Sequence, residues 1–341
     1  MSYKISVIMP IYNAENTLNN AVQSVINQTF GFENIELILI DDASSDNSRN
    51  IILDYCNKYE NIVHYFSEIN HGYPSFGRNV GLKLATSDYL MFIDNDDEYD
   101  KNLCKNLYET ITKENADIVC CNKVSVDPIG NVNQKIKYRN GIEKGDNVLI
   151  NGDDLLFFES ITIWNKIFKK EIIKNNNISF VENAIGDDFA FSMDYYLNST
   201  KMVYLKNYNG YYWKISSDSL SHAVTKDYIL GFLNVFSYTH NQLLLKNKEQ
   251  YVTDVFKNHI YDRIGECSYL NLNFKETNEI LSHVNDFEKE INFNDKFNVL
   301  WADIINYFIL SEHYNLATFS LKFIKTLRNI TWLRKLSRKL K

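Results

Sequence analysis

The chain has 341 residues, of which 45% are hydrophobic, and its formal net charge is −7. This length predicts two domains with enough apolar residues for a core, and the negative charge argues against nucleic acid as a general partner. The five cysteines show neither a disulfide framework nor metal-finger spacing. The sequence contains no apolar run near the ~20 residues of a membrane span and no secretory signal, so a cytoplasmic location is expected.

Apolar runs and helical patterns alternate through the first part of the chain. Each apolar run of five or six residues bounded by polar ones predicts a buried strand. The expected elements are a strand at 5–10, a helix at 18–28, a strand at 35–40, a helix capped by Ser45 or Asp46, a strand at 62–66 and a helix from Gly77 through Leu84. This alternation predicts a parallel sheet covered by helices.

Carboxylates crowd the end of the next predicted strand. The apolar run Tyr89–Ile93 leads directly into Asp94–Asp97, and ligands of open α/β sheets bind at such carboxyl ends. Neighbouring anions are costly unless a cation neutralises them, and oxygen ligands with an open side suit Mg²⁺ or Mn²⁺. A solvated acidic turn is the plainer alternative. An EF-hand loop fits poorly, because Tyr99 replaces its glycine and Lys105 its last glutamate.

Five segments, in order along the chain, resemble the family 2 glycosyltransferases, which have the GT-A fold. They are SVIMPIYNAENTL, SVINQTF, ELILIDDASSDNS, GRNVGLKLATSDYLMFIDNDDEYD and IGDDFAF. The resemblance covers roughly residues 4–222 and, with IWNKIFKKEII, is most similar to bacterial enzymes of wall teichoic acid, capsule and surface polysaccharide synthesis. It implies a GT-A catalytic domain at 1–224, with a Rossmann-like, mostly parallel sheet flanked by helices. The pattern beyond Thr225 predicts a mostly helical C-terminal region at 225–341.

The resemblance implies a site for a nucleotide-diphosphate sugar, expected to be UDP-linked. Asp42 resembles the residue that accepts the uracil N3–H, with helix capping as its alternative. Pro10 and Tyr12 would form a flat wall against the base, unless Tyr12 only packs. Arg78 would face a phosphate at the start of its helix, the alternative being a surface ion pair. The whole expected donor site is Pro10, Tyr12, Asn13, Glu15, Asp42, Asn70, Gly72, Arg78, Asp94, Asn95 and Asp96.

The family's metal and base motifs also have counterparts. Asp94 and Asp96 resemble its DxD pair, which implies that they hold Mn²⁺ or Mg²⁺ against the diphosphate, Asp96 most directly. Asp97 would orient the loop or the acceptor. Inverting transfer needs a base for the acceptor hydroxyl, and the resemblance assigns that role to Asp188, with Asp187 supporting acceptor binding. Acids at a helix N-terminus are a compatible alternative for this pair.

Two further residues and the C-terminal tail carry weaker signals. Trp164 would stack on an acceptor sugar or pack in the core, and His222 would be a third metal ligand or an exposed loop residue. After Glu312 the sequence has no acidic residue, while basic and apolar residues interleave to the end. Such a tail suits peripheral contact with an anionic membrane, the alternative being a packed helix with a solvated basic face.

The sequence therefore predicts an inverting, metal-dependent glycosyltransferase for a glycan, polyol-phosphate or lipid-linked saccharide acceptor. A GT-A-like protein that binds glycan or a partner without catalysis is the main alternative, and the joint presence of Asp42, the DxD pair and Asp188 argues against it. A nucleotidyltransferase would need a glycine-rich basic loop after the first strand, and a dinucleotide oxidoreductase would need GxGxxG. An aspartyl-phosphate phosphatase would carry threonine or valine where Glu98 stands.

Overall fold

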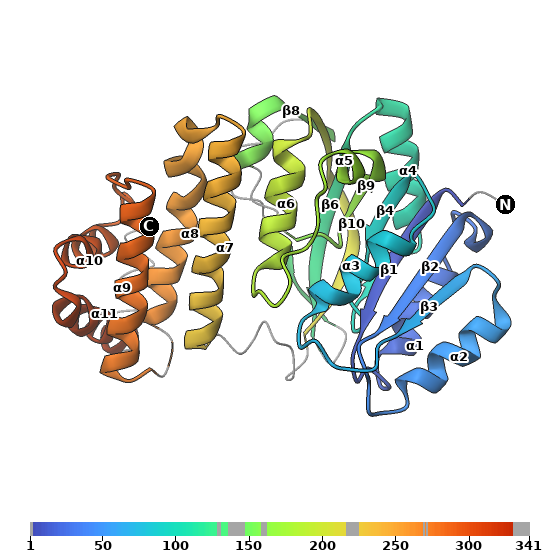
Figure 1. Cartoon of the computed structure of the whole chain (residues 1–341), viewed down its shortest axis with the longest axis horizontal. Coiled ribbons are helices and arrows are strands. Elements are labelled where there is room, and N and C mark those ends of the chain that lie inside the picture. The colour runs from blue at the N-terminus through green and yellow to red at the C-terminus, as the bar shows by residue number, and fades with distance from the viewer. Residues whose placement is uncertain are drawn as a thin grey trace. The chain divides into compact units, whose positions relative to one another are not determined.

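The computed structural model of the chain describes residues 3–127, 131–135, 147–157, 162–215, 225–268, 270 and 272–329. The chain divides into two compact units, residues 1–217 and 218–341, which run from blue to yellow and from gold to red in Figure 1. Residues 216–224 lie outside the described residues. They include His222 and the domain boundary predicted after residue 224. None of the described helices is long and apolar enough to cross a membrane.

The first unit is built on one sheet. Its strands are β1 (Ile5–Ile11), β2 (Ile35–Asp41), β3 (Ile62–Phe66), β4 (Tyr89–Phe92), β5 (Glu98–Tyr99), β6 (Ile118–Val126), β7 (Val132–Lys135), β8 (Asn147–Asn151), β9 (Lys166–Lys169) and β10 (Lys201–Lys214). The order across the sheet is β3-β2-β1-β4-β9-β6-β10-β5, with β7 paired to β6 and β8 to β10.

The parallel, helix-covered sheet predicted from the sequence corresponds to its first four strands. β1 pairs in parallel with β2 and β4, and β2 with β3. Every residue of β1 and β2 is buried, as expected for strands covered on both faces. Beyond β4 the sheet is mixed, because β9 runs antiparallel to both β4 and β6 while β6 and β10 are parallel. The sequence did not predict this inserted strand.

Helices cover this sheet. They are α1 (Leu18–Ile26), η1 (Phe32–Asn34), α2 (Ser48–Lys58), α3 (Pro74–Leu84), α4 (Leu103–Glu114), η2 (Gly152–Phe157), α5 (Lys170–Asn175) and α6 (Asp187–Leu197). α3 packs on β1 and β2, α2 on β3, and α4 on β6, β9 and β10. Ser45 or Asp46 was predicted to cap α2, but the residue that precedes the helix is Asn47. The Asp46 carboxylate nevertheless accepts the Ser48 N–H at 3.0 Å.

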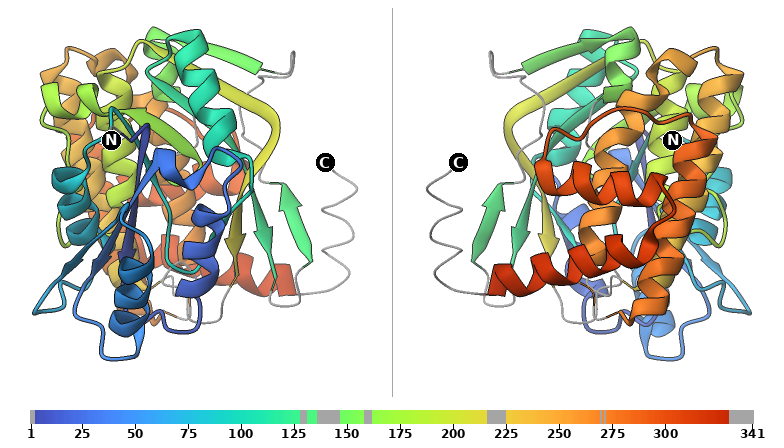
Figure 2. Two further views of the ribbon diagram at one scale, coloured as in Figure 1. Left: turned by 90° about the vertical axis from the view of Figure 1, so that its right-hand side faces the viewer. Right: turned by 90° about the vertical axis from the view of Figure 1, so that its left-hand side faces the viewer.

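The second unit is helical, as predicted. It comprises α7 (Lys226–Leu245), η4 (Glu249–Tyr251), α8 (Val252–Cys267), α9 (Phe274–Glu290), α10 (Leu300–Leu310) and α11 (Tyr314–Asn329). Among the described residues of this unit, α9 packs against α7, α8, α10 and α11, which are gold-to-red ribbons in Figure 2. Phe236, Phe256 and Phe287 form an aromatic cluster in its core, with ring centroids 5.0–5.7 Å apart.

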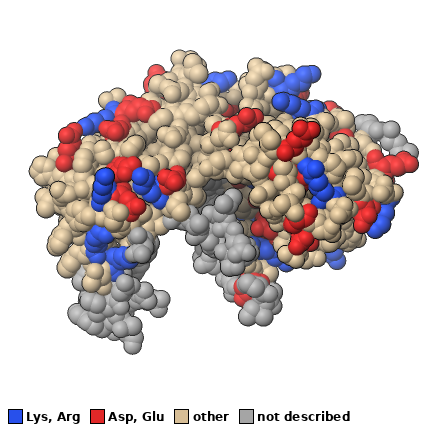
Figure 3. All heavy atoms as spheres, turned by 60° about the horizontal axis from the view of Figure 1, so that its bottom comes forward, with Lys and Arg blue, Asp and Glu red and all other residues tan. Residues whose placement is uncertain are grey.

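Charges of both signs are distributed over the surface. On the face drawn in Figure 3, described Lys and Arg side chains are interspersed with Asp and Glu. The described residues therefore form no broad basic area on that face of the kind that attracts nucleic acid.

Candidate active site

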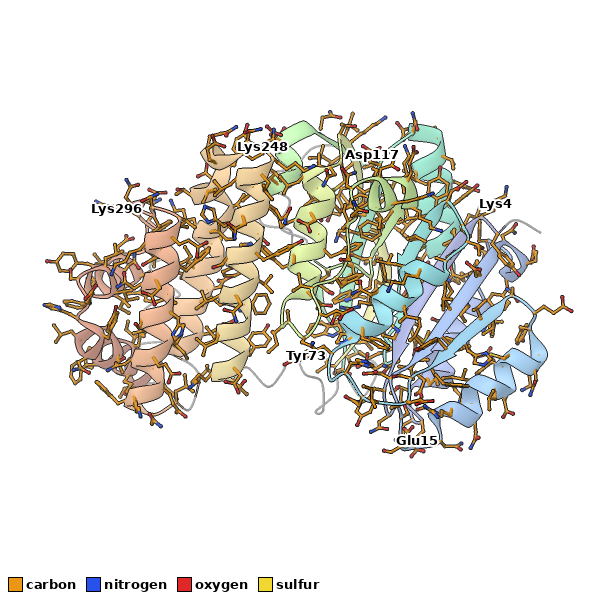
Figure 4. All side chains as sticks on the ribbon, viewed as in Figure 1. Lys4, Glu15, Tyr73, Asp117, Lys248 and Lys296 are labelled. Carbon is orange, nitrogen blue, oxygen red and sulfur yellow. The ribbon has the colours of Figure 1, made fainter. Side chains whose placement is uncertain are left out.

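The residues predicted to bind the nucleobase and the metal lie where the parallel strands β1, β2 and β4 reach their carboxyl ends. In Figure 4 Glu15 and Tyr73 mark this edge of the first unit and Lys4 the opposite edge. Tyr12 and Asp42 follow the paired ends of β1 and β2, so they leave the sheet side by side. This edge is the usual ligand site of open α/β sheets.

Asp42 is held by a loop residue that the sequence did not single out. Its carboxylate accepts the backbone N–H of His71 at 2.8 Å and contacts His71 Nδ1 at 2.7 Å. The helix-cap alternative for Asp42 is therefore wrong, since α2 begins only at Ser48. Tyr12 is 49% exposed, so the packing alternative for this ring is also wrong, and its face is open to a ligand.

Two predicted donor-site residues, Asn13 and Glu15, bind the neighbouring loop instead of standing free. Asn13 Oδ1 accepts the Ser45 N–H at 2.8 Å, and Glu15 Oε2 accepts the Asn47 N–H at 2.9 Å. In the same loop Ala43 adopts a left-handed φ of 60°. Such a conformation costs roughly 1–3 kcal/mol and persists only where the surroundings impose it. These bonds therefore hold the β2–α2 loop, and Asp42 with it, in one arrangement.

The other residues predicted to bind the donor lie on β1 and on neighbouring loops. Pro10 is buried in β1, and its carbonyl accepts a hydrogen bond from Asn95 Nδ2 at 3.0 Å. Because Pro10 is buried, Tyr12 alone of the two residues predicted to form a flat wall offers a face to the nucleobase. Asn70 and Gly72 are both exposed on the loop after β3, and Gly72 has a φ of 81°, which favours glycine at this turn.

Arg78 joins carboxylates from two distant parts of the chain. Its Nη1 donates to Asp187 at 2.8 Å and to Asp188 at 2.6 Å, and its Nη2 donates to Asp94 at 3.0 Å. Arg78 is 4% exposed, so the surface ion-pair alternative is wrong. Because α3 begins at Pro74, Arg78 lies in the second turn of the helix and does not open it as predicted.

The electrostatics of this cluster distinguish its aspartates. Burial would lower the pKa of Arg78, but the charges of Asp188, Asp187 and Asp94 raise it. Burial raises the pKa of Asp188 to about 7 against the opposing charge of Arg78, and it raises the pKa of Asp187 as well. The side chains of Asp94, Asp188 and Asp187 are 32%, 21% and 10% exposed. Asp94 and Asp188 are thus the two that a ligand reaches most readily.

The start of α6 explains the position of the acidic pair. Gly186 precedes the helix with a φ of 86°, and Asp187 and Asp188 form its first turn. Carboxylates are favoured there by the helix dipole. The helix-terminus interpretation is therefore correct and coexists with the contact to Arg78.

Asp96 and Asp97, in the predicted DxD segment after β4, have different surroundings. Asp97 is 1% exposed and accepts hydrogen bonds from the Tyr211 hydroxyl at 2.6 Å and the Lys214 N–H at 2.8 Å. Asp97 therefore orients this loop against β10. Burial first, and then the charge of Asp94, raise the pKa of Asp96 to about 6. A bound cation would oppose this rise by stabilising the charged carboxylate.

Asp94 and Asp96 are the residues that could hold a divalent cation. Asp96 also borders a cavity of about 210 Å³, lined by Thr17, Asn20, Asp96, Glu98, Val126, Asp127, Lys214 and Ile215. Within the described part of the chain, no group of three or more His, Cys, Asp or Glu side chains forms a metal site. Two carboxylates fit Mg²⁺ or Mn²⁺, which proteins commonly bind with one or two carboxylates and substrate phosphates.

Trp164 packs beside these residues. It is 9% exposed, and its ring stacks on Tyr211 with a centroid distance of 4.8 Å. Lys123 Nζ lies 4.3 Å from the centroid of the Trp164 ring, so the core-packing alternative describes this tryptophan. Burial and then Lys166 lower the pKa of Lys123 to about 7, while Asp188 opposes the change. Lys123 was not predicted from the sequence, where its only signal is a lysine within the mostly apolar run of β6.

The mixed, helix-flanked sheet with aspartates at its carboxyl edge defines a GT-A-type protein. The fold matches the crystal structure of S. aureus TarS 1-349 in complex with UDP-GlcNAc with a TM-score of 0.74, covering 95% of this chain and 92% of that chain at 20% identity. This match confirms the predicted fold class.

The sequence comparisons specify the family. Residues 6–176 match the family described as Glycosyl transferase family 2. The chain is 31% identical over 262 residues to the poly(ribitol-phosphate) beta-N-acetylglucosaminyltransferase TarP of Staphylococcus aureus, covering 76% of this chain and 74% of TarP. It is also 31% identical over 213 residues to a poly(ribitol-phosphate) beta-glucosyltransferase of Bacillus spizizenii, covering 61% of this chain and 32% of that relative.

The chain belongs to glycosyl transferase family 2, as predicted. It spans about a third of the length of the Bacillus relative and about three quarters of TarP.

Proposed function

We propose that the chain is an inverting glycosyltransferase that moves a sugar from a UDP-linked donor to a hydroxyl of a glycan or cell-surface polymer. The observation that carries this proposal is the cluster in which Arg78 binds Asp94, on the predicted donor side, and Asp188, the predicted base. Family membership supports the reaction class. The names of the two relatives favour a polyol-phosphate polymer as the acceptor class.

The donor would bind across the carboxyl ends of β1, β2 and β4. Tyr12, which is half exposed, offers a ring face for the nucleobase, and the Asp42 carboxylate would accept the uracil N3–H. Asp94 and Asp96 would hold a Mn²⁺ or Mg²⁺ ion, which when bound offsets the charge on the departing diphosphate.

Asp188 would act as the general base. Its carboxylate would accept the proton of the acceptor hydroxyl while that oxygen attacks the anomeric carbon on the face opposite the diphosphate, which inverts the anomeric configuration. Arg78 binds Asp188 Oδ1 at 2.6 Å, so one oxygen is fixed and the other is left for the acceptor. A pKa of about 7 suits a base that works near neutral pH. Asp187, which is less exposed, would support this arrangement.

The experiment is the Asp188→Asn variant, assayed by nucleotide release from UDP-sugars with a polyol-phosphate acceptor. Transfer should fall by about 10²–10⁴-fold, the usual contribution of a positioned base, while UDP affinity stays near that of the unmodified protein. Asp54→Asn, a change of an exposed acid on α2, is the matched control. Normal turnover by Asp188→Asn would remove Asp188 from the role of base.

We also propose that the basic C-terminal tail contacts the cytoplasmic face of an anionic membrane. Phe319 and Phe323 of α11 are 65% and 55% exposed, and the basic residues from Lys322 onward supply the complementary charge. Residues 330–341 lie outside the described residues. Removing the tail by truncation after Ser320 would not test this contact cleanly, because it would also remove Leu321, which is fully buried.

Charge substitution tests this contact and leaves the length of the chain unchanged. Changing Arg334, Lys335, Arg338 and Lys339 to glutamine should weaken co-sedimentation with phosphatidylserine vesicles, since each well-placed basic residue contributes about 1 kcal/mol. Transfer to a soluble acceptor should be unchanged. Equal sedimentation of the two proteins at low salt would favour the packed-helix alternative.

A further inference from the structure

The carboxylate of Asp42 is held on both of its oxygens by one residue. Oδ2 accepts the backbone N–H of His71 at 2.8 Å, and Oδ1 lies 2.7 Å from His71 Nδ1. An ionised carboxylate only accepts hydrogen bonds, so Nδ1 carries the hydrogen. Each carboxylate oxygen has a second lone pair, with which it could accept a hydrogen bond from a ligand.

The His71 side chain is itself held in a fixed orientation. Its ring stacks on Phe76, in the first turn of α3, with centroids 3.5 Å apart and planes 9° from parallel. The His71 side chain is 27% exposed and that of Asp42 is 11% exposed, so the pair lies at the edge of the protein without being free to rotate in solvent. The pairing therefore fixes the plane in which Asp42 presents its remaining lone pairs.

We propose that His71 is a positioning residue that makes the Asp42 subsite selective for a nucleobase with a ring N–H. This inference rests on the proposed UDP-linked donor. Uracil presents N3–H to an acceptor, whereas cytosine has an unprotonated N3 in the same position and would meet the carboxylate with a second acceptor. The His71 Nδ1–H adds a second hydrogen bond to the Asp42 carboxylate and so fixes the direction of its remaining lone pairs. The difference in binding between the two bases depends on that direction.

The His71→Leu and His71→Asn variants test this role, since both keep the backbone hydrogen bond. Leucine cannot donate to Asp42, while the asparagine Nδ2 can replace the histidine Nδ1–H. Calorimetry with UDP and with CDP, each in the presence of Mn²⁺, gives the two affinities. The His64→Leu variant is the matched control, because His64 is an exposed histidine of β3 whose Nδ1 lies 3.4 Å from Cys56 Sγ.

The expected results separate positioning from folding. The unmodified protein should bind UDP at least about tenfold more tightly than CDP, which is the effect of one charge-assisted hydrogen bond. His71→Leu should weaken UDP binding about tenfold and bring the UDP-to-CDP ratio near one. His71→Asn should stay within about threefold of the unmodified protein. At saturating donor the turnover of His71→Leu should be unchanged while its KM rises, and thermal unfolding checks that each variant is folded.

The outcomes also distinguish this inference from the proposed function. If the unmodified protein prefers UDP and His71→Leu keeps both the affinity and the UDP-to-CDP ratio, the role of His71 is wrong and the proposed donor stands. If His71→Leu and His71→Asn lose the same affinity, the hydrogen bond to Asp42 is not the cause and the role is again wrong. If the unmodified protein binds no UDP, the proposed donor fails and the inference fails with it.

Discussion

Replacing Arg78 by methionine removes the buried cation that Asp94, Asp187 and Asp188 share. Three charge-assisted hydrogen bonds of 2.6–3.0 Å would be lost, each worth about 1.5–3 kcal/mol. The carboxylates can limit this loss by taking up protons, because the pKa of Asp188 already lies at about 7 with Arg78 in place. We therefore expect the free energy of unfolding to fall by about 3–5 kcal/mol at pH 7, the usual result of breaking a buried ion pair.

The pH dependence of this loss tests its cause. Without Arg78 the folded-state pKa values of Asp187 and Asp188 rise further above their unfolded values, because the guanidinium that opposes the rise is gone. Folding then takes up protons and stability declines as pH rises. Urea unfolding should consequently show a larger deficit at pH 8 than at pH 5.5. Adding Asp187→Asn to Arg78→Met should recover part of the loss.

A surface pair provides the control for this experiment. Lys105 lies 4.0 Å from Glu109, and the two side chains are 47% and 63% exposed. Lys105→Met should change stability by no more than about 0.5 kcal/mol. A loss below about 1 kcal/mol for Arg78→Met, or a deficit that does not grow with pH, would refute the reasoning.

The titration of Glu288, Asp188 and Asp96 gives further predictions. Glu288 of α9 is 1% exposed and burial raises its pKa from 4.5 to about 8, so folding takes up a proton and unfolding free energy should fall by about 1.4 kcal/mol per pH unit between those values. Glu288→Gln should remove this slope from a series of urea titrations, and an unchanged slope would contradict the assignment. Transfer should decline as pH drops below about 7, because Asp188 takes up a proton, and a flat rate from pH 8 to 5.5 would argue against this base. Asp96→Asn should abolish Mn²⁺-dependent UDP binding in calorimetry with the fold intact, whereas equal UDP affinity of the unmodified protein in Mn²⁺ and in EDTA would exclude the metal role.

Local signals made the first half of the fold predictable. β1 and β2 are apolar runs bounded by polar residues, and β3 is a short run of β-branched and aromatic residues around His64. Their parallel pairing follows from the helices between them. The ends of β1, β2 and β4 also placed Tyr12, Asp42 and Asp94 at one edge of the sheet. The antiparallel β9 was not predictable in this way, because a four-residue strand such as Lys166–Lys169 carries little periodicity.

The sequence by itself determined the family, the α/β class and the candidate aspartates, because these depend on residue types within short segments. Only the tertiary structure decided which of them act together. Arg78 meets Asp187 and Asp188 across 109 and 110 residues of chain, and His71 reaches Asp42 across 29. Such contacts arise where α3 packs on β1 and β2 and where separate loops meet at the sheet edge, and packing between distant segments leaves no periodic pattern in the sequence.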